Sequence, residues 1–330
     1  MNVLVTGATG FVGAVLMPDL IRQYGAGAVS AFVLPGDPIP ATWRDSGVRT
    51  FTGDIGDISA VRAAVAGHSH IVHLAGFISY AKADADRLRH VNEDGIRSVV
   101  EASLAAGVER LVHISSVGAV GFRHDGSPAD ETTPFNWPEG ILYMASKRRG
   151  QDIVEGAVRE RGLRAVILNP ASIMGPGDHN PATPHNELYR RISRGSFFGS
   201  FSGGLAIVDV RDLVAIISKA LAGRGRDGEG YLVVGANISY RDVIRKISLA
   251  CGKRAYPFPV PSPLLAAAGH VLERAARRGG RRPLLTAAYG RLSGWRAFYD
   301  NAKSRREFDH SYIDPDKTIG DGWEYFRASF

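Results

Sequence analysis

The sequence has little of what marks the specialised classes of protein. Its 330 residues include a single cysteine, Cys251, so no disulfide can form within the chain, and this usage fits a reducing compartment. The first residues lack the basic segment and long apolar stretch of a signal peptide, and no segment is apolar for long enough to cross a bilayer. Internal repeats and low-complexity linkers are absent as well. We therefore expect a cytoplasmic globular protein without an integral membrane segment.

The composition is that of an ordinary globular protein. Hydrophobic residues make up 45% and charged residues 22%, and the length accommodates one large or two modest domains. Lysine and arginine number 40 against 33 aspartates and glutamates, which gives a net charge of +7. This small excess is compatible with an anionic ligand or surface but identifies neither. We expect no nucleic-acid partner and no metal site.

A glycine-rich turn organises the beginning of the chain. The apolar run Val3–Val5 predicts a short strand, and the residues from Ala14 onward predict a helix. Between them, Gly7 allows a sharp turn, Gly10 lets the backbone approach a pyrophosphate, and Gly13 lets the helix pack closely on the strand. The free N–H groups of a helix N-terminus bind phosphate. Strand, glycine turn and helix in this order predict a dinucleotide site; a surface turn without a ligand is the alternative.

Strands and helices alternate after this turn. The continuous apolar run Ile71–Gly76 is typical of a strand buried in a parallel sheet, and we expect His73 within it to be structural. The helix predicted over His90–Gly107 has apolar residues at helical spacing and ends in a glycine cap. Asp57 or Ser59 would cap the preceding helix. Further strands are predicted at 28–34, 48–51 and 111–116, and from 166 onward.

Tyr143 and Lys147 form the pair that best indicates catalysis. They lie four residues apart near the start of a predicted helix, so both side chains emerge on one face, about one turn apart. A phenol with a pKa near 10 is a poor acid or base at neutral pH, and a neighbouring ammonium lowers this pKa by stabilising the phenolate. A Tyr-x-x-x-Lys pair is common by chance, so its weight comes from the motifs that precede it.

Taken in order, these motifs resemble the extended, epimerase/dehydratase-like short-chain dehydrogenases/reductases. The resemblance extends from Val3 to about Asp212, and it implies an α/β fold: a Rossmann-type doubly wound parallel sheet with a smaller C-terminal substrate lobe. Residues 1–175 would form the NAD(P)-binding domain, with 205–235 returning to it, and 176–330 would form most of the lobe. The motifs are Thr6 with Gly7-x-x-Gly10-x-x-Gly13, the Asp54 turn, the Asn92 helix, the strand end Ser115–Ser116 and Tyr143-x-x-x-Lys147.

The resemblance also implies roles for individual residues. Ser116, rather than Ser115, would hold the substrate oxygen, Tyr143 would give or take its proton, and Lys147 would also hold the nicotinamide ribose. Asn92 would link the central helix to the site. The implied cofactor contacts are Gly7, Thr9, Gly10, Phe11, Val12, Gly13, Leu34, Asp54 (on the adenine amino group), Ile55 (beside the ring), Leu74, Ala75, Gly76, Tyr143, Lys147, Pro170 and Ala171.

The end of the second strand bears on the choice of cofactor. An acid there binds the ribose 2′-hydroxyl of NAD, and an arginine accepts the 2′-phosphate of NADP. Leu34 stands where reductases of this family often carry arginine, Asp37 is close by, and no basic residue follows until Arg44. The sequence therefore favours NAD, with NADP as the alternative.

The implied reaction is hydride transfer between a nicotinamide and a secondary alcohol or ketone. Sugar-nucleotide enzymes of the family usually carry an arginine near the position of Leu205, and this chain has none there. The segments Val208–Leu213 and Phe298–Lys303 look more like the 3β-hydroxysteroid dehydrogenase and dihydroflavonol reductase branch. A nucleotide-sugar epimerase or dehydratase using bound NAD is the alternative. A non-catalytic dinucleotide-sensing protein is a third hypothesis, which the retained Tyr143–Lys147 pair disfavours.

The remaining features concern the substrate and possible partners. A basic cluster at 274–282 ends an amphipathic helix; it is either a solvated helix end or a patch for peripheral contact with a membrane or an acidic partner. A homodimer formed through two helices is an expectation by analogy alone. Aromatic residues in loops expected to overhang the site would suit a fairly apolar small-molecule substrate, or else are plain packing: Phe77, Tyr80, Phe122, Phe135 and Trp137.

Overall fold

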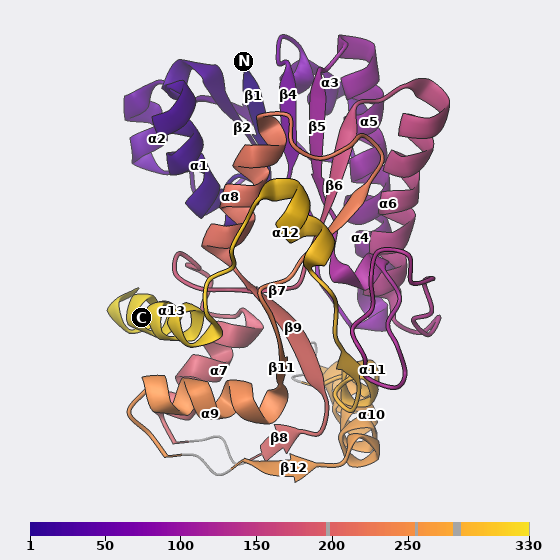
Figure 1. The fold of residues 1–330 in the computed structure, drawn as a ribbon, viewed down its shortest axis with the longest axis vertical. Coiled ribbons are helices and arrows are strands. Elements are labelled where there is room, and N and C mark those ends of the chain that lie inside the picture. Colours follow the sequence, from indigo (N-terminus) through magenta and orange to yellow (C-terminus); the bar gives the residue numbers. More distant parts are fainter. Residues whose placement is uncertain (196–198, 255–256, 280–284, 330) are drawn as a thin grey trace.

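A seven-stranded sheet forms the centre of the protein in the computed structural model, which describes residues 1–195, 199–254, 257–279 and 285–329 (Figure 1). Neighbouring strands are all parallel, in the order β10-β6-β5-β4-β1-β2-β3. Because the strand order reverses between β1 and β4, their carboxyl ends lie where open α/β sheets bind ligands. The predicted Rossmann-type doubly wound sheet is confirmed. The strands are β1 Val3–Thr6, β2 Val29–Val33, β3 Arg49–Thr52, β4 His70–His73, β5 Arg110–Ile114, β6 Ala165–Pro170 and β10 Gly230–Val233.

Helices cover both faces of this main sheet. Helices α1 (Phe11–Tyr24) and α8 (Val210–Leu221) pack on one face, in a core that contains Val3 and Val5. Helices α3 (Ile58–Val65), α5 (Gly95–Ala106) and α6 (Leu142–Arg161) cover the other, in a core that contains Leu4. The strands feed both cores because successive side chains point to opposite faces. Two short helices, α2 Ala41–Ser46 and α4 Ala85–Arg89, lie in the connections.

The helix predicted over His90–Gly107 begins differently from the prediction. Its first five residues, His90–Asp94, form a π-helical turn that runs directly into α5. Gly107 then ends the helix with a left-handed φ of 65°, as predicted. Asp57 caps α3, because its carboxylate accepts the N–H groups of Ser59 and Ala60, which settles the alternative between Asp57 and Ser59.

A smaller lobe lies at the carboxyl ends of the main-sheet strands (Figure 1). Its largest sheet has β9 at the centre, paired with β7, β11 and β13, and a separate pair joins β8 to β12. The strands are β7 Ser172–Met174, β8 Gly199–Phe201, β9 Gly204–Asp209, β11 Ala236–Ser239, β12 Phe258–Val260 and β13 Arg296–Ala297. The helices are α7 Pro184–Ser193, α9 Tyr240–Ala250, α10 Ser262–Gly279, α11 Ala287–Leu292, α12 Ala302–Phe308 and α13 Pro315–Ser329.

The chain passes between the main sheet and the smaller lobe more often than the sequence implies. Within 205–235, α8 and β10 do belong to the main sheet and its helices, whereas β9 pairs only with strands of the lobe. In the other direction, α12 packs against β10 and α8, although its residues fall in the segment assigned to the lobe. The boundaries 1–175 and 176–330 stay a prediction, because the tertiary contacts cross them.

Candidate active site

The glycine loop between β1 and α1 has the geometry that a pyrophosphate requires. Gly7 has a φ of 68°, and a Cβ there would lie 2.7 Å from the Ala75 nitrogen. A Cβ on Gly13 would overlap the backbone of Ala8, so this glycine packs α1 against the turn that follows β1 rather than against the strand itself. Gly10 is exposed, and a Cβ there would meet only the Gly7 carbonyl oxygen, at 3.3 Å. The middle glycine therefore leaves open space over the backbone, where a phosphate fits.

The start of α1 is also suited to an anion. Gly10 is the N-cap, and no side chain of the described residues caps this helix, so its first N–H groups are available to a phosphate. Phe11 and Val12 flank this opening and are both half-buried. The Phe11 ring lies 5.6 Å from the ring of His185 on α7, so the lobe approaches the start of α1.

Asp37 is tied to the glycine loop. The Thr9 hydroxyl donates a hydrogen bond of 2.5 Å to the Asp37 carboxylate, which lies in the loop after β2. Leu34 stands at the end of β2 with 47% of its surface exposed. The place where a dinucleotide ribose would bind thus presents a carboxylate and an apolar side chain.

Asp54 lies at the end of β3 with a defined environment. Its carboxylate accepts a hydrogen bond of 2.8 Å from the Gly56 N–H and pairs with His90 at 2.7 Å. Partial burial alone would raise its pKa, but these two partners outweigh that effect and lower it. Ile55 is buried against Gly95 at the start of α5. The side chain expected to face the adenine is therefore charged and held in place.

The strand ends beside β1 leave space next to Lys147. Leu74 and Ala75 donate backbone hydrogen bonds to the carbonyl and the hydroxyl of Thr6, respectively. Gly76 is exposed, and the nearest atoms to a Cβ placed there are Asn92 Oδ1 at 3.6 Å and Lys147 Nζ at 3.8 Å. A glycine here thus keeps the approach to the lysine open, which fits a ribose at this position.

Pro170 and Ala171 lie at the carboxyl end of β6 and are both buried. Ala171 donates its backbone N–H to the Val233 carbonyl of β10, and Pro170 has no N–H to donate. Neither residue therefore presents a free backbone donor to a ring placed beside it.

The structure brings the three predicted catalytic residues together. Ser116 follows β5; its hydroxyl accepts the Gly118 N–H at 3.0 Å and lies near enough to the Tyr143 phenol to lower its pKa. Lys147 lies one turn along α6 from Tyr143, and its Nζ donates to the Ile114 carbonyl at 3.1 Å. Tyr143 and Lys147 are each 8% exposed. A hydroxyl, a phenol and an ammonium thus converge where β5 ends.

The predicted lowering of the Tyr143 pKa by Lys147 is not what this arrangement produces. Burial raises the pKa of the phenol, and only the hydrogen bond to Ser116 opposes this rise. Burial also lowers the pKa of Lys147 to about 8, because the low-dielectric surroundings disfavour its charge. The lysine is bound to a strand carbonyl and is itself destabilised as a cation, so in the protein alone it does not activate the phenol.

Two buried histidines lie beneath this group. His73 bonds through Nδ1 to the Thr6 hydroxyl at 2.8 Å, and its ring stacks on His113 with centroids 5.5 Å apart. Burial, with the nearby Lys147 charge, lowers the pKa of His73 to about 3 and that of His113 well below its usual value. Both rings are therefore neutral, as expected for a structural His73, and neither ring nitrogen of His113 has a hydrogen-bond partner among the described residues.

Asn92 connects three parts of the site, as the resemblance implied. Its amide accepts the Phe77 N–H at 2.8 Å and donates to the Phe77 carbonyl and to the Ser146 hydroxyl, both at 2.9 Å. Gly150 lets α6 approach this turn closely, because a Cβ there would lie 2.5 Å from the Asn92 carbonyl oxygen. The π-helical turn therefore anchors the helix that carries Tyr143.

Gln151 is a supporting residue that the sequence did not reveal. Its side-chain oxygen accepts hydrogen bonds from Ser115 at 2.9 Å and from Asn169 at 2.7 Å. Asn169 also donates to the Ser116 carbonyl at 2.9 Å. Ser115 is thereby engaged in holding the strand end, which leaves Ser116 to face Tyr143. In the sequence, this role is indicated only by the position of Gln151 one helical turn beyond Lys147, on the same face of the helix.

The aromatic residues expected to overhang the site lie in different surroundings. Tyr80 does reach the site, where its ring meets Tyr143 edge-on with centroids 5.8 Å apart. Phe122 and Trp137 instead pack with Trp295 in a buried cluster behind Tyr80, so for them the plain-packing alternative is correct. Phe77 lies under the guanidinium of Arg87, and Phe135 is 36% exposed.

Aromatic rings from the lobe extend the wall that Tyr80 begins. The ring of Tyr289 on α11 meets Tyr80 edge-on at 5.5 Å, and Phe201 of β8 meets Tyr289 at 5.8 Å. The ring of Tyr240, at the start of α9, packs on Phe201 with centroids 5.0 Å apart. Burial raises the pKa of the Tyr289 phenol. We call Tyr80, Phe201, Tyr240 and Tyr289 the aromatic wall.

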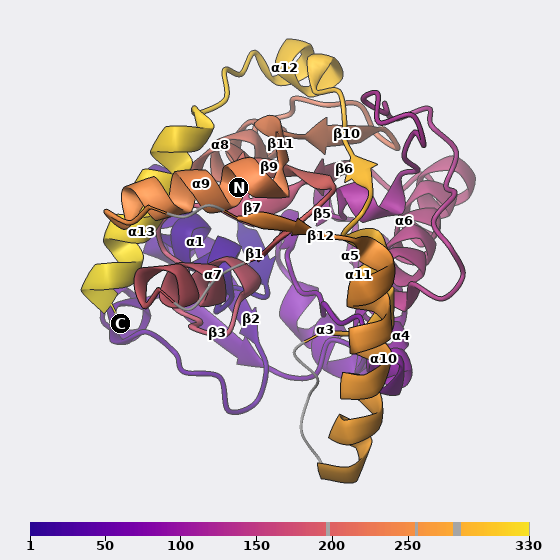
Figure 2. The same ribbon diagram turned by 90° about the horizontal axis from the view of Figure 1, so that it is seen from below.

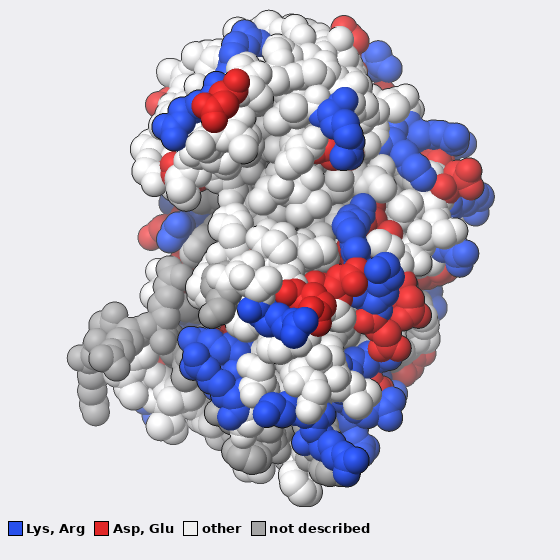
Figure 3. Space-filling view, turned by 90° about the vertical axis from the view of Figure 1, so that its left-hand side faces the viewer, with Lys and Arg blue, Asp and Glu red and all other residues white. Residues whose placement is uncertain are grey.

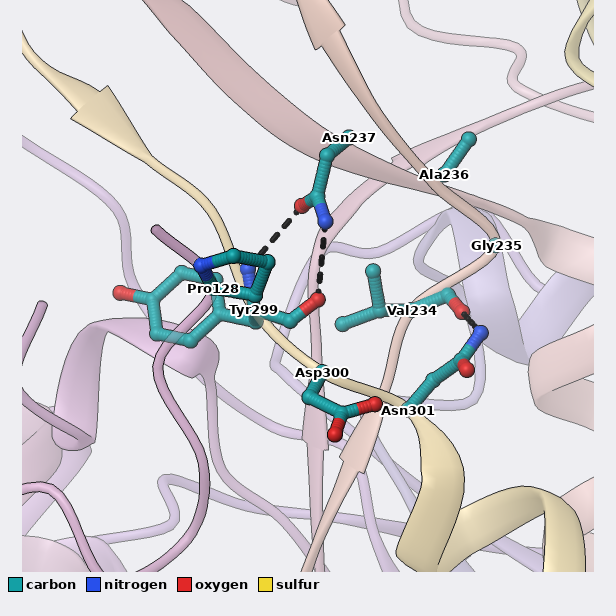
Figure 4. Close-up of a pocket in the computed structure, with 8 residues that line it drawn as sticks. All are labelled: Pro128, Val234, Gly235, Ala236, Asn237, Tyr299, Asp300 and Asn301. Carbon is teal, nitrogen blue, oxygen red and sulfur yellow. Dashed lines mark hydrogen bonds between the residues drawn. The ribbon is translucent and has the colours of Figure 1, made fainter. Parts of the chain in front are cut away.

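A separate hollow of about 480 Å³ lies between the end of β10 and the loop after β13 (Figure 4). Its polar side chains bond to its own walls: Asn237 exchanges two hydrogen bonds with the Tyr299 backbone, and Asn301 donates to the Val234 carbonyl. Asp300 accepts the Ala302 N–H. Of its polar lining groups, the Tyr299 hydroxyl has no hydrogen-bond partner among the described residues, and one such group does not make a catalytic set. The candidate site therefore remains at the strand ends.

Fold and site together define a Rossmann-type nicotinamide dinucleotide enzyme. The chain belongs to the NAD dependent epimerase/dehydratase family, whose model matches residues 3–235. It is an oxidoreductase of that family, as the resemblance in the sequence implied.

Several curated proteins are similar over their whole length. Sterol demethylase protein B of Methylococcus capsulatus is 30% identical over 99% of this chain and 98% of its own. A putative dihydroflavonol 4-reductase of Synechocystis is 28% identical over 98% and 94%, respectively. A 3-beta-hydroxysteroid dehydrogenase of Mycolicibacterium neoaurum is 26% identical over 94% and 86%.

Solved structures agree with the fold. The crystal structure of gox2253 has a TM-score of 0.83 and 30% identity, and covers 99% of this chain and 98% of its own. The dTDP-glucose 4,6-dehydratase DesIV of Streptomyces venezuelae, solved with NAD bound, has a TM-score of 0.77 and 21% identity over 99% and 97%. Structural neighbours of this fold thus bind a nicotinamide dinucleotide.

Three further features concern membrane-spanning helices, metal sites and the basic cluster at 274–282. Within the described ranges, no helix is long and apolar enough to cross a membrane, and no group of side chains is arranged to hold a metal. Arg274 of the cluster at 274–282 is exposed. The side chains of Arg277 and Arg278, and residues 281 and 282 as a whole, lie outside what the structure describes.

Proposed function

We propose that this protein transfers a hydride between a nicotinamide dinucleotide and the secondary alcohol or ketone carbon of an apolar, ring-containing small molecule. The observation that carries the proposal is the position of the Ser116 hydroxyl, near enough to the Tyr143 phenol to lower its pKa, with the buried Lys147 one helical turn from that phenol. The aromatic wall beside Tyr143 supports an apolar substrate. The relatives named for sterols, hydroxysteroids and dihydroflavonols support the same class.

The residues would divide the work as follows. The nicotinamide, when bound, supplies or accepts the hydride. Ser116 would hold the substrate oxygen, and Tyr143 would give that oxygen a proton during reduction or take one during oxidation. Lys147 would bind the nicotinamide ribose in the space beside Gly76. Because burial raises the Tyr143 pKa, the phenol is suited to act as the acid, and proton removal would require further positive charge near it.

We further propose NAD as the preferred dinucleotide. A carboxylate held by Thr9 would accept a ribose hydroxyl, whereas it would repel a 2′-phosphate. Asp37 and the exposed Leu34 both support this preference, because neither supplies the positive charge that NADP requires.

A nucleotide-sugar epimerase or dehydratase is the second candidate, because structural neighbours of that kind share the fold. The region around Leu205 argues against it. Arg211 is the nearest basic residue that follows along the chain, and its guanidinium is bound to Asp209 and Asp321. It is therefore not free to hold a substrate diphosphate.

The test is a turnover panel monitored by nicotinamide absorbance. Sterols and other polycyclic alcohols with NAD or NADP are compared with their ketones plus NADH or NADPH, and UDP- and dTDP-sugars are assayed by product analysis. We expect turnover of a polycyclic alcohol or ketone and a loss of about 10²–10⁴-fold in kcat for Tyr143→Phe. Tyr80→Phe, which keeps the ring that packs on Tyr143, is the matched control and should change kcat little. Turnover of sugar nucleotides alone would overturn the proposal.

A further inference from the structure

The exposed apolar side chains of this protein are concentrated at one end of the lobe. Among the described residues, nine large hydrophobic side chains are exposed, and five of these fall within 24 consecutive positions. Leu249 ends α9, Phe258 lies on β12, and the other three lie on α10; four of the five are at least 62% exposed. The five are Leu249 (67%), Phe258 (72%), Leu264 (62%), Val271 (65%) and Leu272 (40%).

Helix α10 packs on α11 through one of its faces. Gly269 and Gly290 let it approach α11 so closely that a Cβ on either would lie 2.4–2.5 Å from the backbone of the other helix. Its opposite face exposes Leu264, Ala268, Val271, Leu272 and Ala275, at the spacing of one helical stripe. Figure 2, seen from below, shows α10 extending away from the body, with α9 and β12 at the same end of the molecule.

The positive charge of the chain is concentrated in the same segment. Residues 240–282 contain ten lysines and arginines and two acids, a balance of +8, whereas the whole chain carries +7, so the remainder is −1. Figure 3 shows Lys and Arg gathered over the lower end of the molecule, where α9 lies. The exposed basic residues that the structure describes are Arg241, Arg245, Lys253, Arg254 and Arg274. With the five apolar residues they form what we call the α9–α10 surface.

We propose that the α9–α10 surface docks the protein on an anionic lipid bilayer. Apolar side chains on one helix face beside arginines and lysines are the features that bind a helix in the plane of a charged membrane interface. Two copies of this surface would repel each other through their positive charge, which disfavours a second copy as the occupant. An exposed apolar patch of this kind is unusual on a protein that has no partner.

Docking in this way would place the bilayer next to the aromatic wall. The face of α10 opposite the exposed stripe packs on α11, and α11 carries Tyr289 of that wall. A substrate dissolved in the bilayer would then have a short path to the site. The proposal goes beyond the proposed function and does not depend on it, because binding to vesicles is measured without turnover.

The experiment is cosedimentation of the full chain with two kinds of vesicle. One contains phosphatidylcholine alone, and the other also contains about 30 mol% of the anionic lipid phosphatidylglycerol. We expect binding to the anionic vesicles that weakens in high salt, and much weaker binding to the neutral ones. Leu264→Ser/Val271→Ser/Leu272→Ser should lower the partition coefficient at least tenfold, about the effect of losing several buried side chains. Arg241→Gln/Arg245→Gln/Arg274→Gln should lower it for anionic vesicles only.

The matched controls lie on other parts of the molecule. Ile78→Ser alters a side chain that is 67% exposed, like Leu249, and Arg22→Gln/Arg159→Gln alters arginines that are 75% and 71% exposed. Neither should change vesicle binding. Equal losses in the controls, or no binding by the unmodified chain, would refute the proposal. Concentration-dependent self-association that the α10 triple variant abolishes would assign the surface to a second copy instead.

A second measurement avoids any dependence on the triple variant's folding. In a Cys251→Ser background, Leu272→Cys and Ile78→Cys are each labelled with an environment-sensitive fluorophore. Only the label at 272 should shift to shorter wavelength on adding anionic vesicles, because only that position would enter the bilayer interface. No shift at 272, or the same shift at both positions, would contradict the proposal.

Discussion

The two sides of the candidate active site differ in how they are built. The main-sheet side presents polar groups that are buried and paired, while the lobe side presents aromatic rings that pack edge to face. Lys147 on the first side is 8% exposed and bound to the Ile114 carbonyl, and Gln151 holds the ends of β5 and β6 together. On the second side, Tyr289 joins Tyr80 to Phe201.

Under the proposed function, this difference would separate the chemistry from the choice of substrate. Polar groups held by several hydrogen bonds keep one geometry, which a proton transfer requires. Rings that contact one another mainly through apolar surface can differ between relatives without disturbing that geometry. Changes on the main-sheet side should therefore affect turnover of every substrate, and changes on the lobe side should affect which substrate binds.

The substitution with the largest expected effect on turnover is Lys147→Met, which removes the buried ammonium from the main-sheet side of the site. Turnover should fall by about 10²–10⁴-fold, because the ammonium that we propose binds the ribose beside the phenol is lost. The free energy of unfolding at pH 7 should rise by at most about 3 kcal/mol. The pKa of Lys147 is about 8 in the folded chain, below its value in the unfolded chain. Below pH 8 the folded protein therefore contains an unfavourable buried charge, which the substitution removes. Steady-state kinetics and denaturant unfolding measure the two effects, with the exposed Lys317→Met as control. A fall in both would contradict this reasoning.

Leu34→Arg combined with Asp37→Ser tests the cofactor end of the same side. The ratio of NADH to NADPH affinity should shift towards NADPH by about 10–100-fold, as expected when a charged hydrogen bond is exchanged for a charge of opposite sign. Calorimetric titration with both dinucleotides measures the ratio. Thr9→Val, which removes the donor to Asp37 but keeps the carboxylate, should leave the ratio close to that of the unmodified chain. An unmodified chain that already prefers NADPH would show that the NAD assignment is wrong.

Tyr289→Ala tests the lobe side. Removing this ring should raise KM for a polycyclic substrate by about tenfold, the effect of losing one apolar contact of this size, and leave kcat for a small ketone within about twofold. Tyr289→Phe keeps the ring and loses only its hydroxyl, so it should have the smaller effect. If Tyr289→Ala instead lowered kcat equally for large and small substrates, the two sides would not be separable.

His113→Leu gives the smallest expected effect and concerns stability alone. Both His73 and His113 have folded pKa values below the unfolded value near 6.5, so the unfolded chain binds protons that the folded chain does not, and stability falls as the pH falls below about 6.5. Replacing one histidine should reduce this slope by up to about 1.4 kcal/mol per pH unit. Urea unfolding at several pH values between about 6 and 4 measures the slope, and an unchanged slope would contradict the prediction.

The order and spacing of residues along the chain predicted much of the main-sheet side of the candidate active site. The three glycines, the Ser115–Ser116 strand end and the Tyr143–Lys147 pair each depend on neighbours within a few residues, so their local geometry follows from their order along the chain. The structure places them at one edge of one sheet because the carboxyl ends of parallel strands must meet there. The assignment of these residues to catalysis and cofactor binding stays a proposal for the experiments above.

The sequence by itself determined the strand–glycine turn–helix unit, the parallel sheet and the helix that carries Tyr143 and Lys147, because local periodicity and turn chemistry encode these. Only the tertiary structure decided that Tyr80 meets Tyr289, that Phe122 and Trp137 are buried packing, and that β9 belongs to the lobe. It also decided the pKa values, since burial opposes the expected activation of Tyr143. These properties arise from tertiary contacts and from the exclusion of water, and neither follows from spacing along the chain.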